Sequence, residues 1–202
     1  MRSFRVLAAA LATLTLFACT FSRGPVASGT RLTSPSPNPA DSKAADLRTR
    51  LDLLLGEHVM VIAKESSAAR RADELAGYLH LLTSNGSDLT EVVRSALGVA
   101  AAARFDVIWS AQNDYLVNYT IGLVTHNKGK SDAAAASLVT GFVPQFSGFA
   151  ADVAQIPQGP IAQLVMQHAL QTRAVIDDQV AQTYPRLYTD LHNEKANHLC
   201  RR

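Results

Sequence analysis

The sequence is poor in the residues and motifs that most often reveal a catalytic or cross-linked protein. Only two of its 202 residues are cysteine, Cys19 and Cys200, and Trp109 is its single tryptophan. The chain contains no Cys-x-x-Cys, Cys-x-x-Cys-His, His-Glu-x-x-His, Glu-x-x-His or Gly-x-Ser-x-Gly motif. It therefore lacks the usual sequence signs of a zinc site, an attached haem, a di-iron centre or a serine hydrolase. These absences favour a protein without catalytic activity.

Neither sign of charge predominates in the chain. It has 19 Lys and Arg residues against 17 Asp and Glu residues, and a formal net charge of +2. Loss of the first 18 residues, which include Arg2 and Arg5, would leave 17 basic against 17 acidic residues. Binding to a phosphate backbone requires a surplus of Lys and Arg on one face. We therefore expect no nucleic-acid partner.

No apolar run approaches the ~20 residues that a membrane-spanning helix needs. The apolar stretch from Val6 to Ala18 follows Arg2 and Arg5, which is the order of a secretory signal peptide. The closing residues Leu16-Phe17-Ala18-Cys19 resemble the bacterial lipobox, in which the cysteine is acylated and the preceding peptide is removed. We predict that residues 1–18 are a lipoprotein signal peptide and that Cys19 is the lipidation site. The alternative is an ordinary cleaved signal in which the cysteine occurs by chance.

Acylation of Cys19 would anchor the protein in the cell membrane, with its domain on the extracytoplasmic side. Cys200 would then have no partner within the chain, so we expect a free thiol or an intermolecular link there. Residues 19–41 are rich in Pro, Ser, Gly and Thr and have no apolar period. This composition is typical of a flexible linker. We assign residues 42–202 to one domain.

Apolar residues recur at three- and four-residue spacing throughout this domain, which is the pattern of helices with one buried face. Residues 84–87 read Ser-Asn-Gly-Ser and predict a turn, and Asp88 with Glu91 predicts the N-terminal cap of the helix that follows. Gly98 is expected to interrupt that helix. The apolar spacing of residues 47–62 carries on through residues 68–82, and further predicted helices cover residues 99–126, 132–155 and 161–183. Pro185 is expected to bend or restart the last helix before the stretch to residue 198.

Strict alternation of apolar and polar residues, the sign of a strand, is scarce in the chain. We predict an all-α fold, an antiparallel four- to five-helix bundle, either ferritin-like or built from a duplicated helical hairpin. The duplication rests on a weak echo, since Gly77-Tyr78 recurs as Gly141-Phe142 at an offset of 64 residues. Ser131 is expected to cap the helix that begins at residue 132, and Gly141 with Pro144 is expected to kink it.

Three predicted helices each carry a polar residue on their apolar face: His58, Gln112 and His168. Burial of such a group without a partner costs about 1–3 kcal/mol. We therefore expect these side chains to meet one another, a carboxylate or a ligand. One hypothesis is a structural hydrogen-bonded layer that fixes the register of the helices.

The alternative hypothesis is a ligand site inside the bundle. Two imidazoles, from His58 and His168, would suit a transition metal, with Glu65, Gln112 or Asp178 as further ligands. The same two histidines would alternatively bind a haem. The identity of any protein or small-molecule partner is left open by the sequence.

Several short motifs resemble a group of uncharacterised small bacterial helical-bundle proteins in which a His-Val or His-Leu helix motif recurs. The motifs are Leu55-x-x-His58-Val59, Phe105-x-x-x-Trp109, Asp132 followed by four alanines, Gln167-His168-x-Leu170-x-Thr172, and Tyr184 with Tyr188. The resemblance implies a helical bundle with inward-facing histidines, and it implies no reaction. Gln112 stands where that pattern would place a middle histidine. We therefore expect a lipid-anchored envelope protein with a binding or structural module.

Overall fold

The computed structural model describes residues 42–199, and every regular element among them is a helix. The all-α helical bundle predicted from the sequence is confirmed. The predicted signal peptide 1–18, Cys19 and the linker to residue 41 lie outside the described residues. The elements are α2 (Lys43–Ala68), α3 (Ala72–Leu97), α4 (Val99–Val124), α5 (Lys128–Ser137), the π-helix η2 (Leu138–Phe142), α6 (Val143–Ala154), α7 (Gln158–Ala181) and α8 (Tyr184–Leu199).

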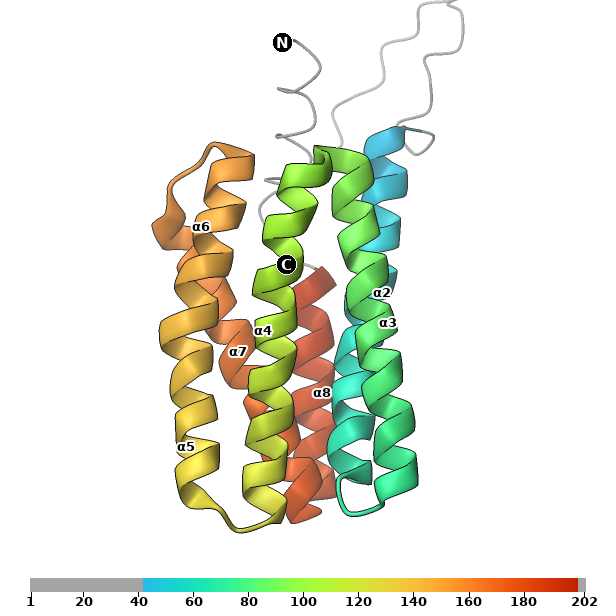
Figure 1. The fold of residues 1–202 in the computed structure, drawn as a ribbon, viewed down its shortest axis with the longest axis vertical. Coiled ribbons are helices and arrows are strands. Elements are labelled where there is room, and N and C mark those ends of the chain that lie inside the picture. The colour runs from blue at the N-terminus through green and yellow to red at the C-terminus, as the bar shows by residue number, and fades with distance from the viewer. Residues whose placement is uncertain (1–41, 200–202) are drawn as a thin grey trace, which may run out of the picture.

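The helices run alternately up and down, as their short connections require (Figure 1). Helices α5, η2 and α6 follow one another without a break and form one long rod beside α4. Helix α4 lies in the middle of the bundle, where it contacts α2, α3, α5, α6 and α7. Helix α8 lies behind α4 in Figure 1 and packs on α7 and α2.

The predicted turn at residues 84–87 and the predicted helix cap at Asp88 and Glu91 are both wrong, because residues 84–87 lie inside α3. The hydroxyl groups of Ser84 and Ser87 donate to carbonyl oxygens four residues earlier, so they are satisfied within the helix. The side chain of Asn85 is buried against α2, which gives this polar residue a tertiary role. Asp88 and Glu91 are consequently in mid-helix and cap nothing.

The break between α2 and α3 lies instead at residues 69–71, which contain no glycine or proline. Gly98 does end α3 as predicted, and its φ of 89° and ψ of 175° belong to a region that is almost exclusive to glycine. The predicted cap at Ser131 is also wrong. Asn127 is the N-cap of α5, because its side-chain oxygen accepts a hydrogen bond from Lys130 N at 3.0 Å.

The predicted irregularity near Gly141 and Pro144 corresponds to the π-helix η2 and the start of α6. Gly141 belongs to η2, and Pro144 lies in the first turn of α6, directly after η2. A Cβ atom on Gly141 would lie 3.4 Å from the Tyr115 hydroxyl. The rod formed by α5, η2 and α6 therefore lies close to α4 at this glycine.

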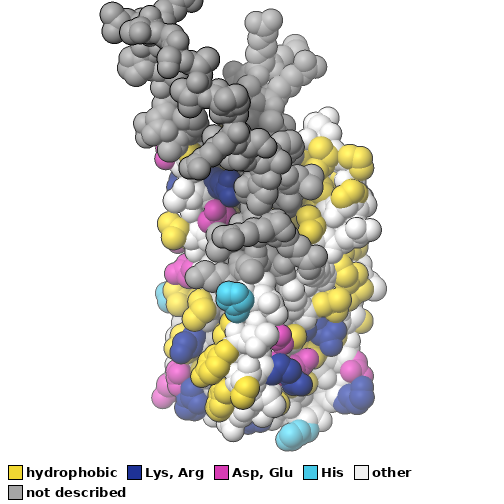
Figure 2. All heavy atoms as spheres, turned by 180° about the vertical axis from the view of Figure 1, so that it is seen from behind, with side chains coloured by type: hydrophobic (Ala, Val, Ile, Leu, Met, Phe, Trp, Pro, Cys, Tyr) yellow, Lys and Arg dark blue, Asp and Glu magenta, His cyan; other side chains and the backbone are white. Residues whose placement is uncertain are grey.

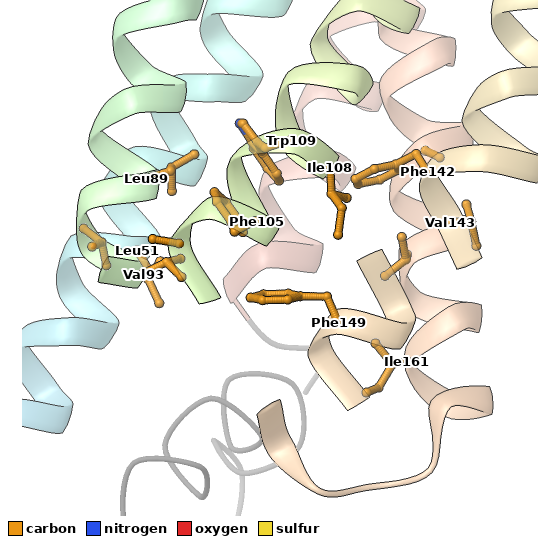
Figure 3. Close-up of a cluster of buried hydrophobic side chains, with 14 residues drawn as sticks. Leu51, Leu89, Val93, Phe105, Ile108, Trp109, Phe142, Val143, Phe149 and Ile161 are labelled. Atoms are coloured by element: carbon orange, nitrogen blue, oxygen red, sulfur yellow. The ribbon is translucent and has the colours of Figure 1, made fainter. Parts of the chain in front are cut away.

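The largest apolar cluster is centred on α4 (Figure 3). Phe105, Ile108 and Trp109 project from α4 between residues of α2 and α3 on one side and of η2 and α6 on the other. A second cluster continues towards the other end of α4 and includes Leu116 and Tyr119. The core therefore extends along both halves of α4, and this helix positions the buried polar residues described next.

Candidate functional site

The structure brings together two of the three inward-facing polar residues predicted from the sequence. The side-chain nitrogen Nε2 of Gln112 on α4 lies 3.3 Å from Nε2 of His168 on α7. This contact joins the Gln112 amide to the His168 imidazole, and the tautomer of the imidazole sets which group donates. Gln112 is completely buried, and His168 is half-buried. We call this contact the Gln112 pair.

His58, the third predicted residue, is buried on α2 beside the same part of α4. Its ring centroid lies 4.8 Å from that of Trp109, and the two rings are tilted by 52°. Trp109 and Gln112 are three residues apart and so share one face of α4. His58 therefore lies at the level of the Gln112 pair, and its ring contacts that of Trp109.

Glu65 lies two turns further along α2 and is completely buried. Its Oε2 atom lies 3.2 Å from the hydroxyl oxygen of Thr120 on α4. Burial raises the pKa of the Glu65 carboxyl from 4.5 to about 7, and the Thr120 hydroxyl opposes this rise in part. Among the described residues, no donor reaches the Oε1 atom.

The neutral form of Glu65, which burial favours, can also be satisfied by Thr120. The Thr120 hydroxyl also lies 3.1 Å from the carbonyl oxygen of Leu116, and it has only one hydrogen to donate. If Glu65 is protonated, the carboxyl donates to the hydroxyl while the hydroxyl donates to the carbonyl. Both contacts are then satisfied without a buried charge.

A further polar contact between α4 and α7 was not predicted from the sequence. The Tyr119 hydroxyl donates to Asp177 Oδ1 at 2.6 Å, and Arg173 Nη2 donates to the Tyr119 oxygen at 3.3 Å. The Arg173 guanidinium also lies over the Tyr119 ring, 4.9 Å from its centroid. Burial, followed by the bond to Asp177, raises the pKa of Tyr119. The sequence did hold a sign of this contact, because Tyr119 follows Gln112 by seven residues and therefore lies on the same face of the predicted helix.

Asp178, predicted as a carboxylate ligand, is buried at the junction of α7 and α8. It forms an ion pair with Arg186, and its Oδ1 atom accepts a hydrogen bond from the Thr183 hydroxyl at 2.7 Å. Asp178 follows His168 by ten residues, which corresponds to about 15 Å along a helix. Its carboxylate therefore has partners of its own, far from the Gln112 pair.

The predicted metal ligands are distributed over separate contacts along the bundle. Glu65 and His58 are seven residues apart, or about 10 Å along α2. In the part of the chain that the structure describes, no three His, Cys, Asp or Glu side chains form a group that could hold a metal ion. At His168 the Nε2 atom faces the Gln112 amide at 3.3 Å. Binding of a metal or haem stays a prediction.

A shallow hollow with a volume of about 350 Å³ lies between α4 and α6. Arg104, Val107, Ile108 and Gln145 line it. Arg104 is already paired with Asp152 at 2.7 Å, so its charge is not directed at a ligand. On the face shown in Figure 2, basic side chains lie next to acidic ones instead of gathering into a field of one sign.

Within residues 42–199, no helix combines the length and the apolar character that crossing a membrane requires. Comparison of the chain with protein-family models, with curated proteins and with solved structures found no match. The resemblance to bacterial helical-bundle proteins therefore stays a prediction. The function has to be inferred from the residues themselves.

Proposed function

We propose that this chain is a lipid-anchored protein of the bacterial cell envelope, whose helical bundle is a non-enzymatic binding or structural module. The observation that carries the proposal is the order of residues at the N-terminus. Arg2 and Arg5 precede an apolar stretch, and this stretch ends in Leu16-Phe17-Ala18-Cys19.

The physical properties of such an anchor suit the rest of the chain. A single acyl chain gives only reversible membrane binding, whereas several chains on one cysteine give durable attachment. The 22 residues from Thr20 to Asp41, which are rich in Pro, Ser, Gly and Thr, would separate the bundle from the anchor.

The interior of the bundle supports a module that depends on a fixed arrangement of helices. The Gln112 pair and the Tyr119–Asp177 bond join α4 to α7, and the Glu65–Thr120 contact joins α2 to α4. Each contact is made only if the helices keep one register. Buried polar contacts of this kind specify a unique packing. We therefore assign the polar layer a structural role.

The anchor is tested by labelling cells with radioactive palmitate and comparing the wild-type chain with Cys19→Ser and Cys200→Ser. The expected result is label and membrane localisation for the wild type and for Cys200→Ser, and neither for Cys19→Ser. Cys200→Ser is the matched control because it removes the only other thiol. Equal labelling of wild type and Cys19→Ser would refute the anchor.

The role of the polar layer is tested on protein purified from membranes in detergent. We expect no stoichiometric metal and no haem absorption band, and we expect His58→Ala and His168→Ala to lower the melting temperature. Stoichiometric metal or a Soret band that disappears in these variants, while helical circular dichroism persists, would replace the structural role by a ligand site.

A further inference from the structure

The two ends of the bundle are formed by different helix connections. Because the helices alternate in direction, the α3–α4 and α6–α7 connections lie at the same end as the start of α2 (Figure 1). We call this the entry end. The α2–α3, α4–α5 and α7–α8 connections lie at the opposite end. The segment that carries Cys19 therefore joins the bundle at the entry end.

The two ends differ in charge. At the entry end, the α3–α4 connection lies in the run 95–103 and the α6–α7 connection in the run 153–172, and neither run contains Asp, Glu, Lys or Arg. At or beside the connections of the opposite end lie the exposed residues Arg70, Arg71, Asp73, Glu74, Lys128 and Asp132. In Figure 2, hydrophobic side chains cover the upper part of the α6–α7 side, whereas charged side chains are seen mainly in the lower half.

Apolar side chains reach the surface at the entry end. Val99, the first residue of α4, is 67% exposed. Leu97 at the end of α3 and Ile156 between α6 and α7 are only partly buried against the largest apolar cluster. Pro157 and Pro160 beside Ile156 are exposed. The apolar core thus extends to this end of the bundle, where no helix covers these side chains among the described residues.

An ion pair holds the two connections of the entry end at one level. Arg104 of α4 lies 2.7 Å from Asp152 of α6. Val99 precedes Arg104 by five residues, and Ile156 follows Asp152 by four, so each lies a little more than one helical turn beyond the pair. The apolar residues of the two connections therefore belong to one surface.

The first turns of α2 add positive charge beside this surface. Between Lys43 and Arg50, α2 carries three basic residues, all of them exposed, and one acidic residue, Asp46. Long cationic side chains can lie along an apolar surface while their charged ends contact anionic lipid headgroups. An apolar surface with basic residues at its edge has the composition of proteins that bind at the membrane interface.

We propose that the entry end docks on the lipid surface, with the α3–α4 and α6–α7 connections in contact with the headgroup region and the opposite end directed away from the membrane. This inference rests on the lipid anchor proposed above. Acylation of Cys19 would bring the entry end to the bilayer, and the apolar and basic residues there would fix the orientation of the bundle. The charged residues of the opposite end would have to lose water to make the same contact.

The orientation is tested with nitroxide labels on the lipidated full chain in vesicles of phosphatidylethanolamine and phosphatidylglycerol. The labels are attached to Gly159→Cys and Gly129→Cys, each in a Cys200→Ser background. Both glycines are exposed and are the second residue of their helix, Gly159 at the entry end and Gly129 at the opposite end. A Cβ atom would meet nothing within 4 Å at Gly159 and only the Asn127 side-chain oxygen, at 3.7 Å, at Gly129.

Electron paramagnetic resonance then measures the access of oxygen, which concentrates in lipid, and of a water-soluble nickel chelate to each label. We expect the ratio of oxygen access to nickel access to be several-fold higher for Gly159→Cys than for Gly129→Cys. Equal ratios, or a higher ratio for Gly129→Cys, would overturn the proposal. Low access of both reagents to Gly159→Cys would show that a protein covers the entry end, and it would also overturn the lipid contact.

The contribution of the apolar surface is tested by adding Val99→Asp to the labelled Gly159→Cys chain. An acidic residue is favourable at the start of a helix, so α4 should stay folded while the oxygen-to-nickel ratio falls. Val107→Asp is the matched control, because Val107 is 69% exposed on the same helix but lies two turns further from the entry end. An unchanged ratio in Val99→Asp, or an equal fall in both variants, would show that the apolar connection does not contact lipid.

The anchor is judged separately, by the mass of the N-terminus in the same preparation. A lipidated chain whose two labels give equal ratios would refute the orientation and leave the anchor intact. A chain without lipid would refute the anchor and, with it, the orientation.

Discussion

Gln112 and His168 are 56 residues apart in the chain, and the side-chain nitrogen of one lies 3.3 Å from the imidazole nitrogen of the other. The contact joins the middle helix of the bundle to α7 and requires the register that both helices have in the structure. It also occupies one of the two imidazole nitrogens through which a ligand could bind. The side chains of Gln112 and His168 therefore join two helices at the position where the sequence suggested a metal site.

Replacement of either partner of the Gln112 pair should destabilise the fold, and replacement of both should cost less than the sum. Gln112→Leu or His168→Leu leaves a polar group without its partner, which costs about 1–3 kcal/mol in the free energy of unfolding. Urea unfolding of the two single variants and the double variant measures the coupling. Gln163→Leu, on the exposed side of α7, is the control. Additive effects would mean that the contact contributes nothing.

Glu65 should make the stability of the protein fall with rising pH. Its pKa in the folded state is about 7, above the value of 4.5 for a solvated carboxyl, because burial disfavours the charged form. The neutral carboxyl thus contributes stability that is fully present below pH 4.5 and is lost as the pH rises through about 7. The full loss is on the order of 3 kcal/mol.

Urea unfolding of Glu65→Gln at pH 5 and pH 8 tests this dependence. The variant cannot ionise at this position, so its stability should decline less than that of the wild type between the two values. Glu91→Gln, which alters an exposed carboxylate paired with Arg94 on the surface of α3, should keep the decline of the wild type. Parallel curves for wild type and Glu65→Gln would show that the buried carboxyl does not titrate in this range.

Gly122 should be intolerant of a side chain, whereas Gly77 should accept one. A Cβ atom on Gly122 would lie 2.5 Å from the backbone nitrogen of Ser131, so α4 and α5 would have to separate. We expect Gly122→Ala to cost about 1–3 kcal/mol. Around Gly77, in mid-α3, no atom lies within 4 Å of such a Cβ. Gly77→Ala should therefore stabilise the protein by about 0.5–1 kcal/mol. Equal changes in melting temperature would contradict the close approach of α4 and α5.

Asn85 should behave as a buried tertiary contact, unlike the two serines beside it. Its side-chain nitrogen donates to the Leu54 carbonyl oxygen at 2.9 Å and to Glu57 Oε2 at 2.8 Å. Asn85→Ala should thus lower the free energy of unfolding by about 1–3 kcal/mol. Ser84→Ala and Ser87→Ala should have little effect or stabilise slightly, because alanine favours a helix. Greater destabilisation by the serine variants would indicate a turn at these residues.

The helical class and most helix positions could be predicted from the sequence because the apolar residues keep a period near 3.6 over long stretches. The wrong turn at residues 84–87 has a clear physical cause. Ser84, Asn85 and Gly86 have the composition of a turn, but the serine hydroxyl bonds to its own helix and Asn85 finds partners on α2. The break at residues 69–71 contains no turn residue that composition could reveal.

The candidate site was predictable in part. The position of a polar residue on an apolar face showed that His58, Gln112 and His168 point inwards, but only the packing of α4 against α7 decides that Gln112 binds His168. Thr120 gave no signal as the partner of Glu65, because the two residues belong to different helices and only the packing of α2 against α4 brings them together. Asp178 was assigned to the same group, but the turn into α8 brings Arg186 to it.

Mass spectrometry of the N-terminus of the native protein, purified from its own cells, tests the lipid anchor most directly. The account predicts a mature chain that begins at Cys19 and carries the added mass of its acyl groups. A chain that begins at Met1, or at any other residue without added lipid, would contradict it.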